Sequence, residues 1–486
     1  MFTQPLNDPQ LLRQQACFGG RWQAATRGET LPVTNPSTGE TLATIPALGE
    51  EETLAAIACA DAVRPAWGKT PEAERARLLE KWHQLILDNA DDLATIMTAE
   101  QGKPLAEARG EVLYGASFVK WFAEEARRIY GEIIPAPTRD RRILVLKQPV
   151  GVAAAITPWN FPIAMITRKV APALAAGCPI IVKPSELTPL SALALMVLAE
   201  RAGFPAGVIQ VLTGLPQAIG ETLTASRTVR KISFTGSTRV GQLLMQQSAE
   251  SIKRLSLELG GNAPLIVFDD ADLEIAISGV MVSKFRNAGQ TCVCANRILV
   301  QRNIYPRFVE KLLAEVAKLK VGDGFVAGNT LGPLINEAAV RKVNAHIDDA
   351  LSQGAELLAG GVHQGEGTFV RPTVLGGVTS AMRIAGEETF GPVAPLFIFD
   401  SEEEAIALAN DTVYGLGAYF FTEDGRRAWR VAEALEFGMV GHNTGAISLE
   451  VAPFGGIKMS GVGREGSHHG IDEYLEIKAF HSGSLS

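Results

Sequence analysis

The sequence predicts an α/β protein whose sheets are mainly parallel and are covered by helices on both faces. Short apolar runs alternate with helical patterns between residues 152 and 248, and this alternation is typical of parallel sheets. The same alternation resumes after Glu258. The chain has 486 residues, which is too many for one hydrophobic core, so we expect two or three domains.

The part of the chain before the first predicted strand is mainly helical. Charged faces at helical spacing predict helices at 53–63, 71–98 and 106–129. Pro71 suits a first helical turn because its missing N–H would have no partner there, and Gln101-Gly102-Lys103-Pro104 ends that helix. Residues 131–142 then form a connector, and the apolar run 145–156 is predicted to be buried strand.

Four strand–helix units follow, and a second α/β set begins near Glu258. The first set has strands at 152–156, 179–182, 208–211 and 231–234, with helices at 163–176, 190–202, 217–223 and 239–248. The second set has strands at 264–267 and 296–300, with helices at 273–287 and 305–317. The segment 474–480 is strand-like. Ligands of such folds bind at the carboxyl ends of the strands, so we expect the site there.

The composition excludes several classes of protein. The net charge is −8 and no long Lys/Arg run occurs, so the sequence gives no support for nucleic-acid binding. The five scattered cysteines are not a disulfide framework, which indicates a reducing compartment and a cytoplasmic protein. The sequence shows neither a secretory signal nor an apolar stretch of membrane-spanning length. H-E-x-x-H and paired C-x-x-C motifs are missing too, so no metal site is indicated. The G-x-x-x-x-G-K-[ST] motif is also missing, so no P-loop is indicated.

The strongest candidate nucleophile is Cys292, in the segment Asn287-Ala288-Gly289-Gln290-Thr291-Cys292-Val293-Cys294. Gly289 favours a tight turn that leaves the thiol on a loop. The turn Glu258-Leu259-Gly260-Gly261 offers a carboxylate. A thiol and a carboxylate on separate turns supply a nucleophile and a base for chemistry at a carbonyl. The alternatives are a buried structural cysteine and a solvated acidic residue at a strand end.

Cys294 complicates the assignment of the nucleophile. Residues two apart in an extended segment share a face, so chemistry alone leaves open which thiol attacks. Neighbouring thiols on one face could also oxidise to a strained, labile disulfide that silences the protein. We therefore treat Cys292 and Cys294 as a candidate redox pair.

Three loops offer further polar groups. Asn160, between Pro158 and Pro162, suits a rigid donor to an oxyanion, although an N-cap is the commoner role for such an asparagine. Lys183 and Glu186 follow a predicted strand and suit ribose hydroxyls, with a solvated turn as the alternative. Gly236 and Ser237 join a strand to a helix, where backbone N–H groups could hold a pyrophosphate.

Taken together and in this order, these motifs resemble the aldehyde dehydrogenase superfamily. The resemblance runs from Phe18-Gly19-Gly20-Arg21-Trp22 through Glu387-Glu388-Thr389-Phe390-Gly391-Pro392 to Pro453-Phe454-Gly455-Gly456. It implies an aldehyde-dehydrogenase-like fold with a Rossmann-type cofactor domain, an α/β catalytic domain and a small β oligomerisation element, in homodimers or homotetramers. We place the cofactor domain at 1–127 and 147–257, the catalytic domain at 258–458 and the oligomerisation element at 128–146 and 459–486.

The resemblance also assigns roles to residues. Cys292 fills the slot of the nucleophile, Glu258 that of the base, and Asn160 with the Cys292 backbone N–H that of the oxyanion hole. Lys169 matches a lysine near the reactive thiol. The positions that contact the cofactor fall on Trp159, Lys183, Glu186, Gly236, Ser237, Glu388 and Phe390.

Three stretches look like the succinate-semialdehyde dehydrogenase branch of the family. They are Ala164-Met165-Ile166-Thr167-Arg168-Lys169, Lys284-Phe285-Arg286-Asn287 and Gly463-Arg464-Glu465-Gly466-Ser467. The residues that hold the distal carboxylate of the substrate in that branch fall on Arg168, Arg286 and Ser448. Bidentate arginine contacts suit a buried carboxylate, whereas a surface ion pair is the usual fate of an arginine. His442 and Ser448-Leu449-Glu450-Val451 depart from the pattern of the branch.

The implied reaction converts succinate semialdehyde, NAD and water to succinate and NADH through a cysteine thiohemiacetal and a thioester. Members that use NADP often carry a small residue where this chain has Glu186. A carboxylate repels a 2′-phosphate, so we predict NAD preference with NADP as the possible second cofactor. Glutarate semialdehyde or a broader ω-oxo-acid range stays open, because one methylene is worth only about 1–3 kcal/mol in a pocket. An enzyme that transfers its acyl group to coenzyme A would need no base for water, so the presence of Glu258 disfavours it. The presence of both Cys292 and Glu258 disfavours an inactive dinucleotide-binding structural protein.

Overall fold

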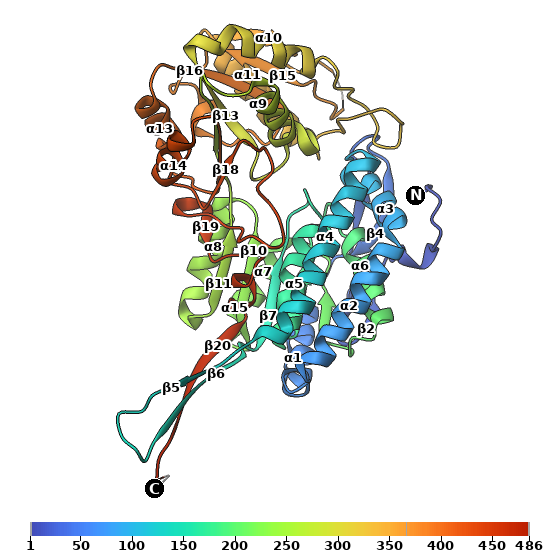
Figure 1. Cartoon of the computed structure of the whole chain (residues 1–486). Helices are drawn as coiled ribbons and strands as arrows, with labels where there is room; N and C mark the ends of the chain where they lie inside the picture. The colour runs from blue at the N-terminus through green and yellow to red at the C-terminus, as the bar shows by residue number, and fades with distance from the viewer. Residues whose placement is uncertain (1, 366, 485–486) are drawn as a thin grey trace.

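The computed structural model describes residues 2–365 and 367–484, and two large sheets form its two lobes (Figure 1). The first sheet has the order β19-β11-β10-β7-β8-β9-β1-β2. Its five central strands are parallel and its edge strands antiparallel. The strands are β1 (Ala16–Phe18), β2 (Arg21–Gln23), β7 (Val152–Ile156), β8 (Ile180–Lys183), β9 (Ile209–Val211), β10 (Val229–Thr235), β11 (Arg254–Glu258) and β19 (Gly461–Val462).

Strand β7 shows why this sheet is buried on both faces. Its sequence is apolar throughout and every residue in it is buried, as parallel strands between two helical layers require. Ala153 and Ala155 pack in one core with residues of the helices α2 (Glu72–Asp88), α3 (Ala90–Gln101), α4 (Leu105–Glu125), α5 (Ala164–Ala176) and α6 (Leu190–Ala202). Their neighbours Val152 and Ala154 pack in a second core with α1 (Glu50–Gly68), α7 (Pro216–Ala225) and α8 (Thr238–Ser248).

The second large sheet has the order β14-β15-β16-β13-β12-β17-β18, and all of its pairs except β14 with β15 are parallel. Its strands are β12 (Ala263–Val267), β13 (Ala295–Gln301), β14 (Glu356–Ala359), β15 (Thr373–Gly376), β16 (Val393–Phe399), β17 (Gly417–Phe421) and β18 (Met439–His442). Its helices are α9 (Leu273–Val280), α10 (Tyr305–Val316), α11 (Glu337–Ser352), α12 (Arg383–Gly386), α13 (Glu402–Asn410) and α14 (Gly425–Ala434). The predicted α/β class is confirmed.

A three-stranded ribbon extends away from the first sheet (Figure 1). It consists of β5 (Glu132–Ile134), β6 (Arg142–Pro149) and β20 (Leu475–Ser482), paired antiparallel in the order β20-β6-β5. Ile133 is 81% exposed and Ile477 is 71% exposed on this ribbon. Two smaller elements complete the fold: the hairpin of β3 (Thr30–Thr34) and β4 (Thr41–Pro46), and the short helix α15 (His469–Asp472). Within the part of the chain that is described, no helix has both the length and the apolar character to span a membrane.

Three predicted elements are wrong in their bounds. The single helix over 71–98 is two helices, because Asn89 leaves the helical conformation and its side chain donates to the carbonyl of Leu85 at 2.8 Å. The apolar run 145–156 is two strands, because Gly151 turns the chain at φ +126° between β6, which lies in the exposed ribbon, and β7. The helix over 273–287 ends at Val280 and continues as a π-helical turn, Met281–Phe285.

Candidate active site

A cavity of about 270 Å³ gathers seven of the predicted site residues from loops of both large sheets. Its lining includes Trp159, Asn160, Gly236, Ser237, Cys292, Glu388 and Phe390. The other predicted site residues do not line it: Glu258, Arg168, Lys169, Lys183, Glu186, Arg286, Cys294 and Ser448. The loops after β7 and β10 and the loop before β13 therefore meet at one point, as the carboxyl-end rule predicts for the first sheet.

Asn160 lies in the loop between β7 and α5, and its side chain is buried. Its Nδ2 donates to the carbonyl of Gln290 at 3.0 Å, so the asparagine is tied directly to the loop that carries the thiol. The N-cap of α5 is Ile163, which makes no side-chain cap hydrogen bond. The alternative of an N-cap asparagine is therefore wrong, and one N–H of the amide is left for another acceptor.

The two thiols have different surroundings. Cys292 is half-buried and lines the cavity, whereas Cys294 is buried and its Sγ donates to the carbonyl of Lys284 at 3.5 Å. The segment is a turn, with the N–H of Cys294 donating to the carbonyl of Thr291 at 3.1 Å, so the extended arrangement with a shared face is wrong. Burial raises the pKa of the Cys292 thiol to about 12, and the nearby Arg168 guanidinium opposes this.

Glu258 ends β11 and is buried. Neither of its carboxylate oxygens has a hydrogen-bond partner among residues 2–365 and 367–484. Burial first, and the neighbouring Glu465 carboxylate second, hold the pKa of Glu258 well above its ordinary value, while Arg168 and Lys169 lower it. A Cβ at Gly455 would lie 2.9 Å from Glu258 Oε1, so the glycine permits this close approach of two loops.

The sequence did not identify Glu465 as part of this site. The carboxylate of Glu465 pairs with Arg168, whose Nε lies 2.6 Å from Oε2, and with the Nζ of Lys169. Lys169 also donates to the Oγ1 of Thr235 at 2.6 Å. The only sequence signal for Glu465 is its place in the stretch 463–467, which resembles one branch of the family. No local pattern specifies the partners of its carboxylate.

Arg168 combines a paired and an unpaired end. The residue is 1% exposed, and its guanidinium carbon lies 3.9 Å from the centroid of the Phe454 ring. Although Nε faces Glu465, the Nη2 atom has no hydrogen-bond partner within the described part of the chain. A surface ion pair is therefore the wrong description of Arg168. Its free end can bind a further anion.

The other two predicted substrate residues lie nearby but differ in burial. Ser448 Oγ is hydrogen-bonded to the hydroxyl of Tyr114, a residue that the sequence did not single out. Tyr114 in turn stacks edge-on with Phe118 at 5.1 Å between centroids. Arg286 is exposed, and its guanidinium carbon lies 4.9 Å from the centroid of the Phe161 ring. Tyr114 reaches Ser448 only through tertiary contact, which no sequence spacing indicates.

The predicted cofactor residues form two groups. Lys183 Nζ pairs with Glu186 at 2.8 Å at the carboxyl end of β8. Ser237 Oγ accepts the N–H of Val240 at 3.4 Å as the N-cap of α8. In the cavity lining, the Trp159 and Phe390 rings meet edge-on at 5.6 Å.

Glu388 lies beside these rings. Its Oε1 accepts the N–H of Gly261 at 3.2 Å, which ties it to the turn after Glu258. Burial raises the pKa of Glu388 to about 7. Phe390 next to it has φ +57°, a left-handed backbone conformation that is uncommon for an aromatic residue. A strained residue held at a cavity wall is typical of a functional loop.

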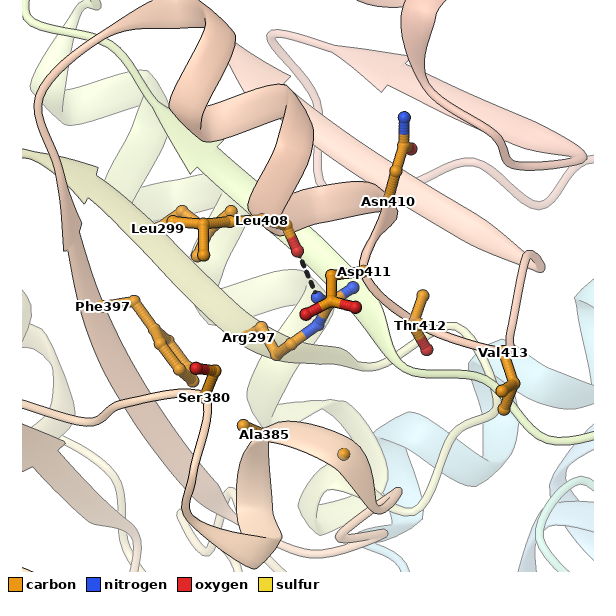
Figure 2. A pocket seen from close by; sticks show the side chains of 11 residues that line it. Arg297, Leu299, Ser380, Ala385, Phe397, Leu408, Asn410, Asp411, Thr412 and Val413 are labelled. Atoms are coloured by element: carbon orange, nitrogen blue, oxygen red, sulfur yellow. Dashed lines mark hydrogen bonds between the residues drawn. The ribbon is translucent and has the colours of Figure 1, made fainter.

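A larger cavity, of about 520 Å³, lies elsewhere in the second lobe (Figure 2). At its floor, the guanidinium of Arg297 donates to the carbonyls of Leu408 at 2.6 Å and Ala409 at 2.8 Å. The side chains around it include no thiol. Cavity size therefore does not identify the site, whereas a thiol, an amide and a buried carboxylate in one place do. The described residues also contain no group of three or more His, Cys, Asp or Glu placed to hold a metal ion.

The profile of the aldehyde dehydrogenase family matches residues 22–480. The chain belongs to the aldehyde dehydrogenase family. The predicted fold is confirmed by a crystal structure of an aldehyde dehydrogenase from Brucella melitensis biovar abortus 2308, which is 62% identical, with a TM-score of 0.98 over 99% of each chain. The present chain is therefore an NAD(P)-dependent enzyme that acts on a small aldehyde.

Relatives within the family cover nearly the whole chain. A 3-sulfolactaldehyde dehydrogenase of Pseudomonas putida is 60% identical over 97% of this chain and 98% of its own length. A glutarate-semialdehyde dehydrogenase of the same species is 59% identical over 97% of this chain and 98% of its own. A succinate-semialdehyde dehydrogenase [NADP(+)] of Escherichia coli is 58% identical, with the same coverage of 97% and 98%.

Proposed function

We propose that this aldehyde dehydrogenase oxidises succinate semialdehyde to succinate. The observation that carries the proposal is the free Nη2 of Arg168, a buried guanidinium nitrogen that has no partner among the described residues and whose charge acts on Cys292 and Glu258. A small aldehyde with a carboxylate at its other end suits both groups at once, since a desolvated guanidinium binds carboxylate strongly. Ser448, held by Tyr114, supplies a hydroxyl to the same end.

In the proposed mechanism, Cys292 Sγ attacks the aldehyde carbon. The thiol is protonated at neutral pH because burial raises its pKa, so attack requires transfer of that proton to a base. Asn160 Nδ2 and the backbone N–H of Cys292 then hold the developing oxyanion. Loss of one such donor typically raises a barrier by about 3–4 kcal/mol, which is why the rigid attachment of Asn160 to the thiol loop matters.

Glu258 is the proposed base. Its carboxylate has no competing hydrogen bond within the described residues, and a raised pKa makes it a better proton acceptor than an ordinary glutamate. It therefore takes a proton from the water that hydrolyses the acyl group on Cys292. Arg168 and Lys169 oppose the rise in its pKa and so favour the ionised form of the carboxylate.

The cleft also fits a nicotinamide dinucleotide. Gly236 and Ser237 place the open first turn of α8 at the cavity that Cys292 lines, and such a turn suits a pyrophosphate. When bound, a nicotinamide dinucleotide would supply the acceptor for the hydride of the substrate carbon. We further propose that NAD is preferred over NADP, because the Glu186 carboxylate repels a 2′-phosphate. The Escherichia coli relative is named for NADP(+), so the preference rests on Glu186 alone.

The names of two relatives give other substrates, glutarate semialdehyde and 3-sulfolactaldehyde. Oxidation of one of these aldehydes is the competing hypothesis. A glutarate semialdehyde is one methylene longer than succinate semialdehyde, and 3-sulfolactaldehyde carries a sulfonate as its anion. An Arg168 clamp accepts each of these anions. The test is a steady-state panel of the three aldehydes and an uncharged aldehyde with both dinucleotides. The highest kcat/KM on succinate semialdehyde supports the proposal, and the highest value on the uncharged aldehyde contradicts it.

We also propose that the exposed ribbon of β5, β6 and β20 mediates assembly into a homodimer or homotetramer. Its apolar side chains, such as Ile133 and Ile477, have no cover within the described chain, and unpaired sheet edges favour association. This agrees with an oligomerisation element at 128–146 and 459–486 beside the cofactor domain (1–127 and 147–257) and the catalytic domain (258–458). The five free cysteines suit a cytoplasmic location.

A further inference from the structure

A buried ion pair lies directly behind the loop that carries Asn160. Lys103 follows helix α3 and is 2% exposed, and Glu111 lies on α4 and is 4% exposed. The Nζ of Lys103 and the Oε2 of Glu111 are 2.5 Å apart. Neither residue lines the cavity, so neither one contacts the reacting atoms.

Both members of the pair hold the Asn160 loop. Lys103 Nζ donates to the backbone carbonyl of Asn160 at 2.8 Å. Glu111 Oε1 accepts the N–H groups of Ile163 at 2.9 Å and Ala164 at 3.2 Å. Since α5 has no side-chain cap of its own, Glu111 supplies the missing acceptor from another helix. The loop is thus fixed on both sides of Phe161, whose ring centroid lies 4.2 Å from Lys103 Nζ.

The same turn also reaches the thiol loop. The Oε1 of Gln101 accepts the backbone N–H of Lys103 at 2.9 Å, and its Nε2 donates to Asn287 Oδ1 at 3.0 Å. Asn287 Nδ2 donates to the carbonyl of Asn160 at 3.0 Å, so that carbonyl has two donors. The left-handed backbone of Asn287, at φ 52°, places its side chain between the two loops. Lys103 and its neighbours therefore set the position of Asn160 relative to Cys292.

Energetics argue that the pair has a positional role. Burying two opposite charges costs several kcal/mol per ion before their attraction offsets it, and well-packed apolar residues are often as stable. In this ion pair, the Lys103 ammonium and both Glu111 oxygens bond either to each other or to the Asn160 loop. Stability alone does not require such an arrangement, whereas fixing one amide does.

We propose that Lys103 and Glu111 are positioning residues that aim the Asn160 side-chain amide at the oxygen of the reacting aldehyde. This inference rests on the proposed function, in which Asn160 is an oxyanion donor. The new element is that the position of the Asn160 amide is set by Lys103 and Glu111, which lie on the turn before α4 and on α4 and do not contact the substrate.

The test is a double-mutant cycle with Lys103→Met and Asn160→Ala in the full-length enzyme. Asn160→Ala should lower kcat by about 10²–10³-fold. Lys103→Met should lower kcat by about 10–100-fold, because misplacing a catalytic group by on the order of 1 Å costs about 10²-fold. In the Asn160→Ala background, Lys103→Met should change kcat by less than about twofold, because the group through which it acts is already gone. The KM for the dinucleotide should stay within about twofold.

Lys253→Met is the matched control. Lys253 is also a buried lysine, and its Nζ donates to the carbonyls of Leu223 at 3.1 Å, Ser226 at 2.7 Å and Val229 at 3.2 Å. It has no bond to the Asn160 loop, so its replacement should leave kcat within about twofold in both backgrounds. Should Lys103→Met fail to fold in a thermal-unfolding assay, Glu111→Gln takes its place in the cycle, because it keeps the acceptor for α5 and removes the charge.

The outcomes separate the two proposals. If Asn160→Ala leaves kcat unchanged, the oxyanion assignment is wrong and the positioning inference falls with it. If Asn160→Ala impairs kcat and the Lys103 or Glu111 change lowers it equally in both backgrounds, the proposed function survives and the positioning inference is overturned. A loss that vanishes in the Asn160→Ala background supports both.

Discussion

Glu258 and Glu111 are two buried glutamates beside the same catalytic loops, and they are bonded in opposite ways. Glu111 accepts from the Lys103 ammonium and from two backbone N–H groups. Glu258 accepts from nothing among residues 2–365 and 367–484. A carboxylate whose oxygens are all occupied holds structure in place, whereas one without partners keeps its oxygens for chemistry. The same contrast separates Cys292 in the cavity from Cys294 behind it.

The largest expected effect comes from the thiols. Cys292→Ala should abolish turnover, since it removes the proposed nucleophile, while Cys294→Ala should keep activity, because Cys294 is buried behind the cavity. Steady-state NADH production measures both. An active Cys292→Ala enzyme, or a dead Cys294→Ala enzyme, would reverse the assignment of the thiol that faces the cavity.

The two glutamates themselves give the next largest effect. Glu258→Gln should stall deacylation, so stopped-flow measurement should show one NADH burst per active site and then almost no turnover. Glu111→Gln keeps one acceptor oxygen, for the N–H groups at the start of α5, and should only slow turnover, by about 10-fold. Equal burst kinetics in the two variants would remove the distinction between a reactive and a structural glutamate.

Replacement of the arginines tests the unpaired end of Arg168. Arg168→Ala should raise KM for succinate semialdehyde by about 10–100-fold, as expected when a hydrogen-bonded charge worth about 1.5–3 kcal/mol is removed. It should raise KM for an uncharged aldehyde much less. Arg286→Ala serves as the comparison, with a smaller effect because Arg286 is exposed. Equal loss on charged and uncharged aldehydes would contradict the carboxylate clamp.

The smallest effect concerns pH. Because the pKa of Glu258 is raised in the folded protein, a deacylation-limited kcat should rise with pH through an apparent pKa above the ordinary glutamate value of about 4.3. The effect of this pKa on the free energy of unfolding has the opposite dependence on pH. A buried carboxyl with a raised pKa favours folding below the unfolded pKa, and that contribution is lost as pH rises through the folded pKa. Thermal unfolding of the wild type and of Glu258→Gln across this range measures the difference, and a flat difference would contradict a raised pKa.

The sequence predicts the parts of the site that short motifs encode. Asn160 between two prolines, Gly236 at a strand–helix turn and Cys292 after Gly289 are local patterns, and the cavity contains all three. Glu465 and Tyr114 were missed because their partners, Lys169 and Ser448, lie far away along the chain. Long-range pairing leaves no periodic trace in a sequence.

The fold shows the same limit. Periodicity predicts β7, β8, β9 and β10 of the first sheet and β12 and β13 of the second, because burial on one or two faces dictates it. It gives no prediction for β11, for β14–β18 or for α11–α14. In the ribbon it predicts β20 and part of β6 as strand but not β5, whose three residues are exposed and which owes its pairing to β6. Nor did it predict the break at Asn89, where one local hydrogen bond outweighs a continuous helical pattern.

The ribbon also bears on how the polypeptide matures. Strand β20 pairs along the whole length of β6, yet the second large sheet and all of the first except β1 and β2 lie between these two strands in the chain order. During synthesis on a ribosome, β6 emerges early and waits with its hydrogen-bonding edge open until β20 arrives. Pairing across such a wide interval is slow, so nascent chains are exposed to edge-to-edge capture by one another in the meantime. Protection of that edge by a chaperone is therefore a reasonable requirement for high yield.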